Sequence, residues 1–162
     1  MHSAEEYSAK DIKVIVFRLL DEHFGVDVSQ VKSIERIDTI TKVPRTPGFV
    51  KGVIHLRGAV IPIIDLKERL GMEPTSMTDQ SRVILVTMDG HEVGIIVDSA
   101  NDVMDISVSS IEPPPRMVSR IDMKYLQGIA KLPDQLLVLL NLDKVLDMEE
   151  IELIFQGEEQ TS

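Results

Sequence analysis

The sequence predicts a mainly β protein made of two small β-barrels in tandem, and three observations lead to this fold class. Short runs rich in valine and isoleucine are separated by turn residues, as is typical of strands joined by hairpins. The same order of runs occurs in both halves of the chain. Only 4% of the 162 residues are aromatic and 43% are hydrophobic, so aliphatic side chains must fill a sizeable core.

The clearest hairpin unit covers residues 49–70, FVKGVIHLRGAVIPIIDLKERL. β-branched residues flank an Arg57-Gly58 turn, and glycine in such a turn is a common hairpin signal. Asp65 is placed to cap a short helix, Glu68 completes a capping box, and Gly71 ends the helix. The segment therefore predicts strand, turn, strand and helix.

A second copy of this unit covers residues 125–146, YLQGIAKLPDQLLVLLNLDKVL. Without gaps, Gly52 aligns with Gly128, and Asn141 takes the place of Asp65 as a helix cap. The apolar positions keep their register, whereas the turn changes from Arg57-Gly58 to Pro133-Asp134. The repeat predicts two equivalent hairpins that differ at the turn.

The rest of the first half predicts strands over residues 13–20 and 24–28. Apolar residues at spacings of three then indicate a short helix over residues 28–35. Pro44 and Pro47 break regular structure before the first hairpin unit.

The second half follows the same plan after a polar linker at residues 72–81. Strands are expected over three runs, a proline-rich connector follows, and a helix near residues 142–148 continues through residues 150–155. The three runs are residues 82–88, 92–97 and 103–108, and residues 93–97 correspond to residues 24–28.

These boundaries give one domain over residues 11–156. The first subdomain covers residues 11–72 and the second residues 80–146, and the C-terminal helix, residues 142–155, packs back on the first subdomain. Residues 1–10 and 157–162 are expected to be disordered tails.

The composition excludes several classes of function. A net charge of −10 argues against nucleic acid and against electrostatic docking on anionic lipid. The absence of cysteine excludes disulfides, thiolate metal sites and a cysteine nucleophile. The polar start lacks the apolar core of a signal peptide, and no apolar run approaches the roughly 20 residues needed to span a bilayer. We therefore expect a cytoplasmic protein without direct membrane insertion.

The sequence contains no pattern that supports catalysis. The four histidines do not share a metal-ligand spacing, and no nucleophile motif or phosphate-binding loop is present. Carboxylates lie in turns, caps and the tail, where capping and solvation explain them. We expect no enzyme activity, no cofactor and no metal.

The candidate functional residues are therefore surface residues. Arg57, with Gly58, projects from a tight turn, where it is either simply solvated or presented to a protein partner. Val31 and Ile34 are either core residues or part of an apolar interface, and Val103 has the same two interpretations.

Six motifs resemble the CheW family of bacterial chemotaxis coupling proteins, and the resemblance runs from Asp11 to Ile154. The most specific is LRGAVIPIIDL at residues 56–66. The others are FGVDV at 24–28, TPGFVKGV at 46–53, VGIIVD at 93–98, DVM at 102–104 and YLQG at 125–128.

The resemblance implies two pseudo-symmetric, SH3-like, five-stranded β-barrels and a non-catalytic adaptor. Its implied partners are the cytoplasmic tip of methyl-accepting chemoreceptors and the regulatory domain of the histidine kinase CheA, within arrays at the membrane. Arg57 and Gly58 match the family's Arg-Gly turn in the receptor-binding region. Val31 and Val103 match apolar positions near the groove between the barrels.

The sequence departs from the family pattern at two positions. His55 replaces the asparagine that commonly precedes Leu-Arg-Gly, and Ser33 replaces a common glutamate, with Glu35 following. These departures bear on the detail of receptor recognition. The alternative function is a related adaptor in a non-flagellar signalling pathway.

Overall fold

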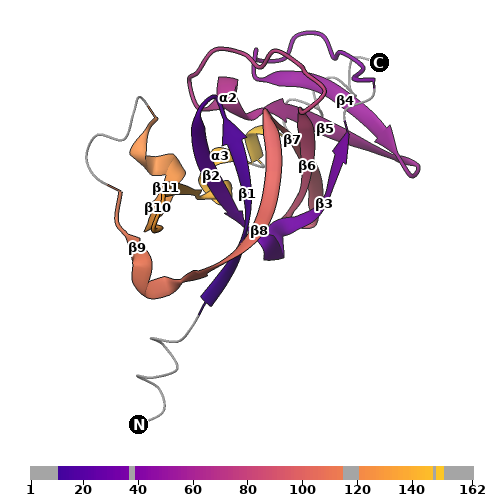
Figure 1. Cartoon of the computed structure of the whole chain (residues 1–162). Helices are drawn as coiled ribbons and strands as arrows, with labels where there is room; N and C mark the ends of the chain where they lie inside the picture. The colour runs from indigo at the N-terminus through magenta and orange to yellow at the C-terminus, as the bar shows by residue number, and fades with distance from the viewer. Residues whose placement is uncertain (1–10, 37–38, 115–120, 148, 152–162) are drawn as a thin grey trace.

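The computed structural model describes residues 11–36, 39–114, 121–147 and 149–151, which form two β-sheets (Figure 1). The first sheet has the strand order β8-β1-β2-β11-β10-β9 and the second β3-β6-β7-β5-β4. The strands of the first sheet are β8 (Ser99–Ser107), β1 (Asp11–Leu19), β2 (Glu22–Asp27), β11 (Leu136–Leu140), β10 (Leu126–Lys131) and β9 (Ile111–Glu112). Those of the second are β3 (Val31–Arg36), β6 (Arg82–Met88), β7 (His91–Val97), β5 (Ala59–Asp65) and β4 (Val50–Leu56). The predicted mainly β class is confirmed.

Each sheet closes towards a small barrel. In the first sheet, the end strands β8 and β9 are joined directly by a 3₁₀ turn, Val108–Ser110. In the second, Thr41 follows β3 and pairs with Val53 of β4, at the opposite end of the strand order. Closure of this kind leaves few unpaired strand edges.

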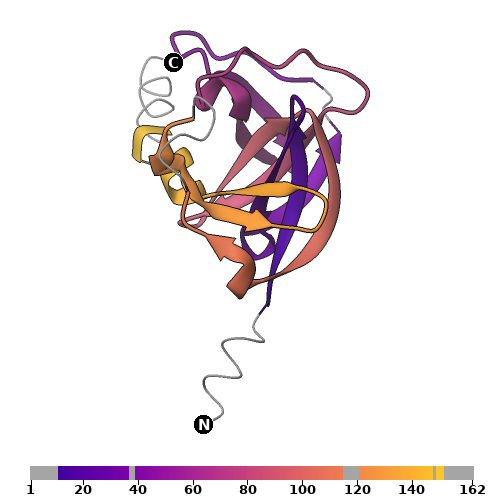
Figure 2. The same cartoon turned by 60° about the vertical axis from the view of Figure 1, so that its left-hand side comes forward.

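The two halves of the chain exchange hairpins between the sheets. The first hairpin, β1–β2, pairs with β8 and β11 of the second half, whereas β6–β7 pairs with β3 and β5 of the first half (Figures 1 and 2). The predicted division into residues 11–72 and 80–146 therefore separates strands of the same sheet and does not follow the barrels. The alternation of apolar and polar residues predicts which side chains face a core. It does not predict which strand pairs with which, because a strand from either half of the chain would fit the same pattern.

Strand register confirms the internal repeat. Gly25 pairs with Val16 on one side and Leu139 on the other, while Gly94 pairs with Leu85 and Ile63 in the same way. A β-bulge also falls at the same place in β3–β6 and β8–β1, between Val31 and Ser33 and between their equivalents Ala100 and Asp102. The molecule therefore has a pseudo-two-fold relation that superposes β1–β3 on β6–β8.

The two hairpin units obey the same relation. Both carry a bulge two residues into the first strand, just before Gly52 and Gly128. At each glycine the neighbouring chain approaches closely: an added Cβ would lie 2.0 Å from the Thr41 carbonyl oxygen at Gly52 and 2.8 Å from that of Glu112 at Gly128. The glycines of the repeat are thus required by backbone packing.

The predicted helix over residues 28–35 is wrong. Only Val28–Gln30 form a 3₁₀ turn, and Val31–Arg36 are strand β3, in which half-buried and exposed residues alternate. Apolar residues spaced by three over so few positions fit a helical turn and a strand equally well. Residues Val31–Arg36 are a strand because they pair with β6.

The predicted helix cap at Asp65 is confirmed. Its Oδ1 accepts hydrogen bonds from the Lys67 backbone N–H at 3.1 Å and the Thr75 hydroxyl at 2.8 Å, and its Oδ2 accepts from the Thr75 N–H at 2.8 Å. The capping box is not formed, because the Asp65 N–H donates to the Phe49 carbonyl and Glu68 pairs with Lys51. The helix is α2 (Leu66–Arg69), and Gly71 follows it with φ of +91°.

The second helix, α3 (Leu142–Val145), begins after Asn141, whose side chain makes no capping hydrogen bond. Arg69 Nε donates to the Val145 carbonyl oxygen at 2.7 Å, and its guanidinium pairs with Glu150 at 3.3 Å. The described part of the predicted C-terminal helix thus lies against the first repeat. Residues 152–155 and the predicted tails lie outside the described residues.

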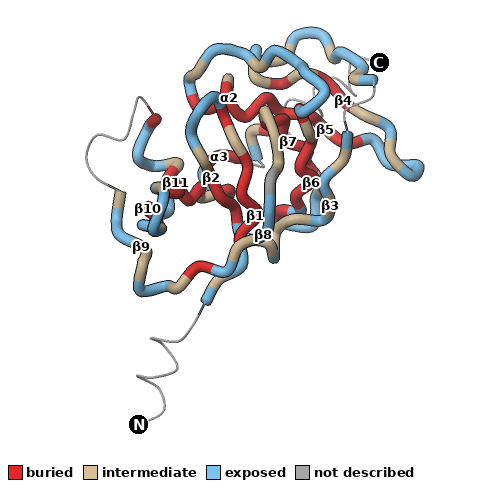
Figure 3. The backbone as a smooth tube through the Cα atoms, in the orientation of Figure 1, coloured by how far each residue is buried: buried red, intermediate tan, exposed pale blue. Residues whose placement is uncertain are grey.

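Figure 3 shows that buried residues run through the strands of both sheets. They form three apolar clusters. One contains residues of the first sheet only, including Val16 and Leu139, and another contains residues of the second sheet only, including Ile63 and Leu85. The largest contains residues of both sheets, and we call it the inter-barrel cluster. The two barrels therefore share one core. No helix among the described residues is long and apolar enough to cross a membrane.

Candidate protein-docking surface

Two exposed apolar side chains lie where the inter-barrel cluster reaches the surface. Ile34 on β3 pairs with Ile84, and Val103 on β8 pairs with Ile15. Paired residues in antiparallel strands point to the same side of a sheet, and Ile15 and Ile84 both belong to the inter-barrel cluster. Ile34 and Val103 are nevertheless 41% and 54% exposed, because β3 and β8 are end strands of their sheets.

Ile34 and Val103 are equivalent residues of the two repeats. Val31 and Ala100 are also equivalent, and both are half-buried and pack against the inter-barrel cluster. We call these four residues the seam surface: Val31, Ile34, Ala100 and Val103. Figures 1 and 2 show β3 and β8 on the same side of the molecule.

A pocket at one end of the seam surface shows how its two strands run. The pocket, of about 470 Å³, is lined by Arg82 of β6 and by Ser99 and Ala100 at the start of β8. Arg82 pairs with Arg36, the last residue of β3. The start of β8 therefore lies near the end of β3, so that the two strands run in opposite directions along the seam.

Arg57 and Gly58 lie apart from these four residues. They form the turn of the β4–β5 hairpin, with φ of +51° and +82°, the left-handed values of a type I′ turn. Both residues are exposed, and Arg57 makes no hydrogen bond or ion pair with the described residues. Figure 1 shows the hairpin reaching outwards past β3. The structure thus presents Arg57 to solvent but does not bring it to the seam surface.

Sequence reasoning missed Ala100 and a second pair of exposed apolar residues. Val60 and Leu136, near the starts of β5 and β11, are 60% and 58% exposed and are equivalent in the two hairpin units. The gapless alignment of the hairpins already places these residues together, and apolar residues at matched positions just after both turns are the signal that could have identified them.

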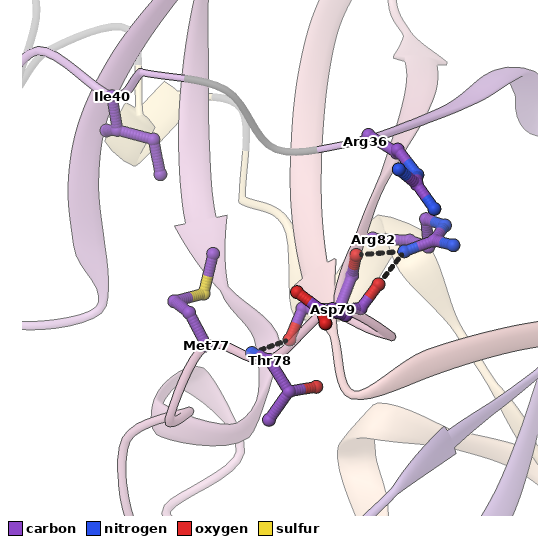
Figure 4. Close-up of a pocket in the computed structure, with 7 residues that line it drawn as sticks. Arg36, Ile40, Met77, Thr78, Asp79 and Arg82 are labelled. Atoms are coloured by element: carbon purple, nitrogen blue, oxygen red, sulfur yellow. Dashed lines mark hydrogen bonds between the residues drawn. The ribbon is translucent and has the colours of Figure 1, made fainter.

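The described residues offer no metal site, since no group of three histidine, aspartate or glutamate side chains among them could hold an ion. Two pockets, of about 380 and 470 Å³, lie at the ends of strands and contain arginine, aspartate and hydroxyl side chains in their linings, and the first also contains Ile40 and Met77 (Figure 4). The seam surface is instead an apolar strip between two barrels, the kind of surface on which a helix or an extended segment of another protein can dock.

Comparison with known proteins identifies the family. Residues 13–150 match the model of the CheW-like domain. The chain is 39% identical over 137 residues to the chemotaxis protein CheW of Bacillus subtilis, covering 85% of this chain and 88% of the relative. It is 34% identical over 140 residues to CheW of Klebsiella aerogenes, covering 86% and 84%.

A solved structure agrees with this result. The crystal structure of the scaffolding protein TtCheW from Thermoanaerobacter tengcongensis has a TM-score of 0.75 and 41% sequence identity, over 82% of this chain and 86% of that chain. The paired SH3-like barrels, the repeat and these matches lead to one conclusion. The chain belongs to the CheW family of chemotaxis scaffold proteins.

Proposed function

We propose that this chain is a non-catalytic adaptor that binds the cytoplasmic tip of chemoreceptors and the regulatory domain of the histidine kinase CheA. It would act in the cytoplasm and be recruited to receptor arrays at the membrane. The observation that carries the proposal is the seam surface, where equivalent apolar residues of both barrels are exposed along one strip.

The shape and chemistry of the seam surface favour a helix of the receptor as its occupant. Ile34 and Val103 form two exposed apolar edges, and the half-buried Val31 and Ala100, on the same two strands, pack against the inter-barrel cluster. An amphipathic helix places apolar residues along one face at spacings of three and four, and such a face packs into a strip of this kind. Arg57, outside the strip, is free to donate hydrogen bonds to the receptor beyond the helix.

The exposed hairpin residues Val60 and Leu136 favour contacts with a second partner. One lies on each barrel, so each barrel can dock on the related barrel of a kinase regulatory domain. Apolar anchors of this kind supply much of the affinity of small interfaces, and repeated weak contacts in an array gain strength from avidity. Receptor and kinase would then bind to different residues at the same time.

A capture experiment with two separate arms tests this proposal. A receptor cytoplasmic fragment and the kinase regulatory domain are each immobilised, and binding of the parent chain is measured to each. Both arms are expected to capture the chain. Val60→Glu combined with Leu136→Glu should reduce kinase capture by roughly tenfold or more and leave receptor capture unchanged.

The matched control for this pair is Leu20→Glu, which places the same charge on a 56% exposed leucine in the turn between β1 and β2. This control should bind both partners like the parent. Failure of the parent chain to bind either fragment would contradict the proposed function. Equal kinase capture by the parent and the double variant would show that the hairpin residues are not the kinase contact.

A further inference from the structure

The seam surface alone does not determine the direction of a bound helix. Its apolar residues form two equivalent pairs on strands that run in opposite directions, so a helix turned end to end would meet the same side chains. Any preference for one direction must come from residues that differ between the two ends. The charged residues next to the strip differ strongly.

At one end of the strip, cations are paired with carboxylates. Lys13 of β1 and Asp105 of β8 face each other across the strands, with Nζ and Oδ1 3.2 Å apart. Lys32 is paired with Glu92 in the same part of the molecule. This end is therefore close to neutral.

At the other end, the equivalent positions hold two arginines. Arg36 takes the place of Asp105 and Arg82 the place of Lys13, so two guanidinium groups face each other across β3 and β6 (Figure 4). His23 occupies the position equivalent to Glu92, and it lines the same pocket as Arg82. Like charges directly opposite in a sheet are unfavourable unless an anion lies between them.

No carboxylate among the described residues forms an ion pair with Arg36 or Arg82. Arg82 Nη1 donates to the backbone carbonyl oxygens of Asp79, at 2.8 Å, and Ser81, at 2.7 Å, and neither of these atoms carries a full charge. Arg82 also lines the 470 Å³ pocket with Arg18, whose Nε is buried without a hydrogen-bond partner.

Two acidic residues, Asp21 and Asp79, also line these pockets. With three arginines against them, the end of the strip that contains Arg36 is cationic on a chain whose net charge is −10. Guanidinium groups bind carboxylates through paired hydrogen bonds, which gives both affinity and geometry.

We infer that the partner of the seam surface is an amphipathic helix with carboxylates at one end of its contact face. Those carboxylates bind Arg36 and Arg82, and this contact sets the direction in which the helix lies. The inference rests on the proposed receptor-binding function and adds the partner's chemistry and orientation. Charge complementarity fixes the orientation, while the apolar strip supplies affinity in either direction.

Affinity for a receptor cytoplasmic fragment tests the charge contact. Arg36→Asp restores the pattern of the Lys13–Asp105 end, and its affinity should fall about tenfold at low salt, with a weaker dependence on salt than the parent shows. The control Arg45→Asp makes the same change of charge at an exposed arginine that lines neither pocket, and it should change affinity less than about twofold.

Orientation is measured with a spin label, because the chain has no cysteine of its own. Gln80→Cys places the label at the arginine end, and Ser109→Cys places it just beyond β8, at the Asp105 end. Each label should broaden NMR signals from a different end of the receptor helix. In the swapped variant Arg36→Asp with Asp105→Arg, the two sets of broadened signals should exchange.

The outcomes separate this inference from the proposed function. If the fragment binds the parent and Arg36→Asp equally well, or if the swapped variant keeps the parent orientation, the charge inference is wrong and receptor binding stands. If the fragment fails to bind the folded parent chain, the proposed function itself is wrong.

Discussion

Replacing both Ile34 and Val103 by aspartate is expected to weaken binding of a receptor fragment by roughly 100-fold, or about 2.7 kcal/mol. The two residues supply the exposed apolar edges of the seam surface, and a bound helix would bury both aspartates without partners. Each single variant should lose about tenfold. Isothermal titration calorimetry with the fragment measures these differences.

The fold should survive this double substitution, because both side chains are exposed in the free protein. Val31 is a poorer choice for such a test, since it packs against the inter-barrel cluster and aspartate there would disturb the core. Leu20→Asp is the control, with a 56% exposed leucine outside the seam surface. Parent-like binding by a folded Ile34→Asp/Val103→Asp variant would exclude the seam surface as the receptor site.

Gly52→Ala is expected to lower the free energy of unfolding by roughly 3 kcal/mol or more. Gly52 has φ of +140°, and an added Cβ would lie 2.0 Å from the Thr41 carbonyl oxygen. That oxygen accepts a hydrogen bond from the Val53 N–H at 2.8 Å, so the closing contact of the second barrel would have to break or move. Urea unfolding followed by circular dichroism measures the loss.

Two other glycines provide a graded comparison. Gly58→Ala should cost only about 1 kcal/mol, because φ is +82° but no atom lies within 4 Å of the new Cβ. Gly128→Ala should have an intermediate effect, since the Cβ would lie 2.8 Å from the Glu112 carbonyl oxygen. If Gly52→Ala were no more destabilising than Gly58→Ala, the close approach of Thr41 would not contribute to barrel closure.

The strands and the repeat could be predicted from the sequence because they rest on local signals. The valine- and isoleucine-rich runs, the Arg57-Gly58 turn and the Asp65 cap all lie where the pattern indicates. The exchange of β1–β2 and β6–β7 could not be predicted, because strand pairing depends on residues far apart in the chain and the apolar pattern allows either partner.

The receptor-binding role of the candidate residues stays a prediction, and the structure shows only where these residues lie. Val31, Ile34 and Val103 do lie together on one strip, although the first two occupy a strand where a helix was expected. The arginine pair was missed because Arg36 and Arg82 become neighbours only when β3 pairs with β6. Whether Arg57 contacts the receptor stays a prediction.

Co-sedimentation of the kinase with receptor-containing membranes tests the central claim most directly. Membranes with chemoreceptors are mixed with CheA, with and without this chain, and the pelleted kinase is measured. We expect the chain to raise the amount of pelleted kinase several-fold, and we expect Ile34→Asp/Val103→Asp to abolish this increase while it still binds the isolated kinase domain normally. An unchanged amount of pelleted kinase, with receptors and folded chain both present, would contradict the claim that this protein couples the two.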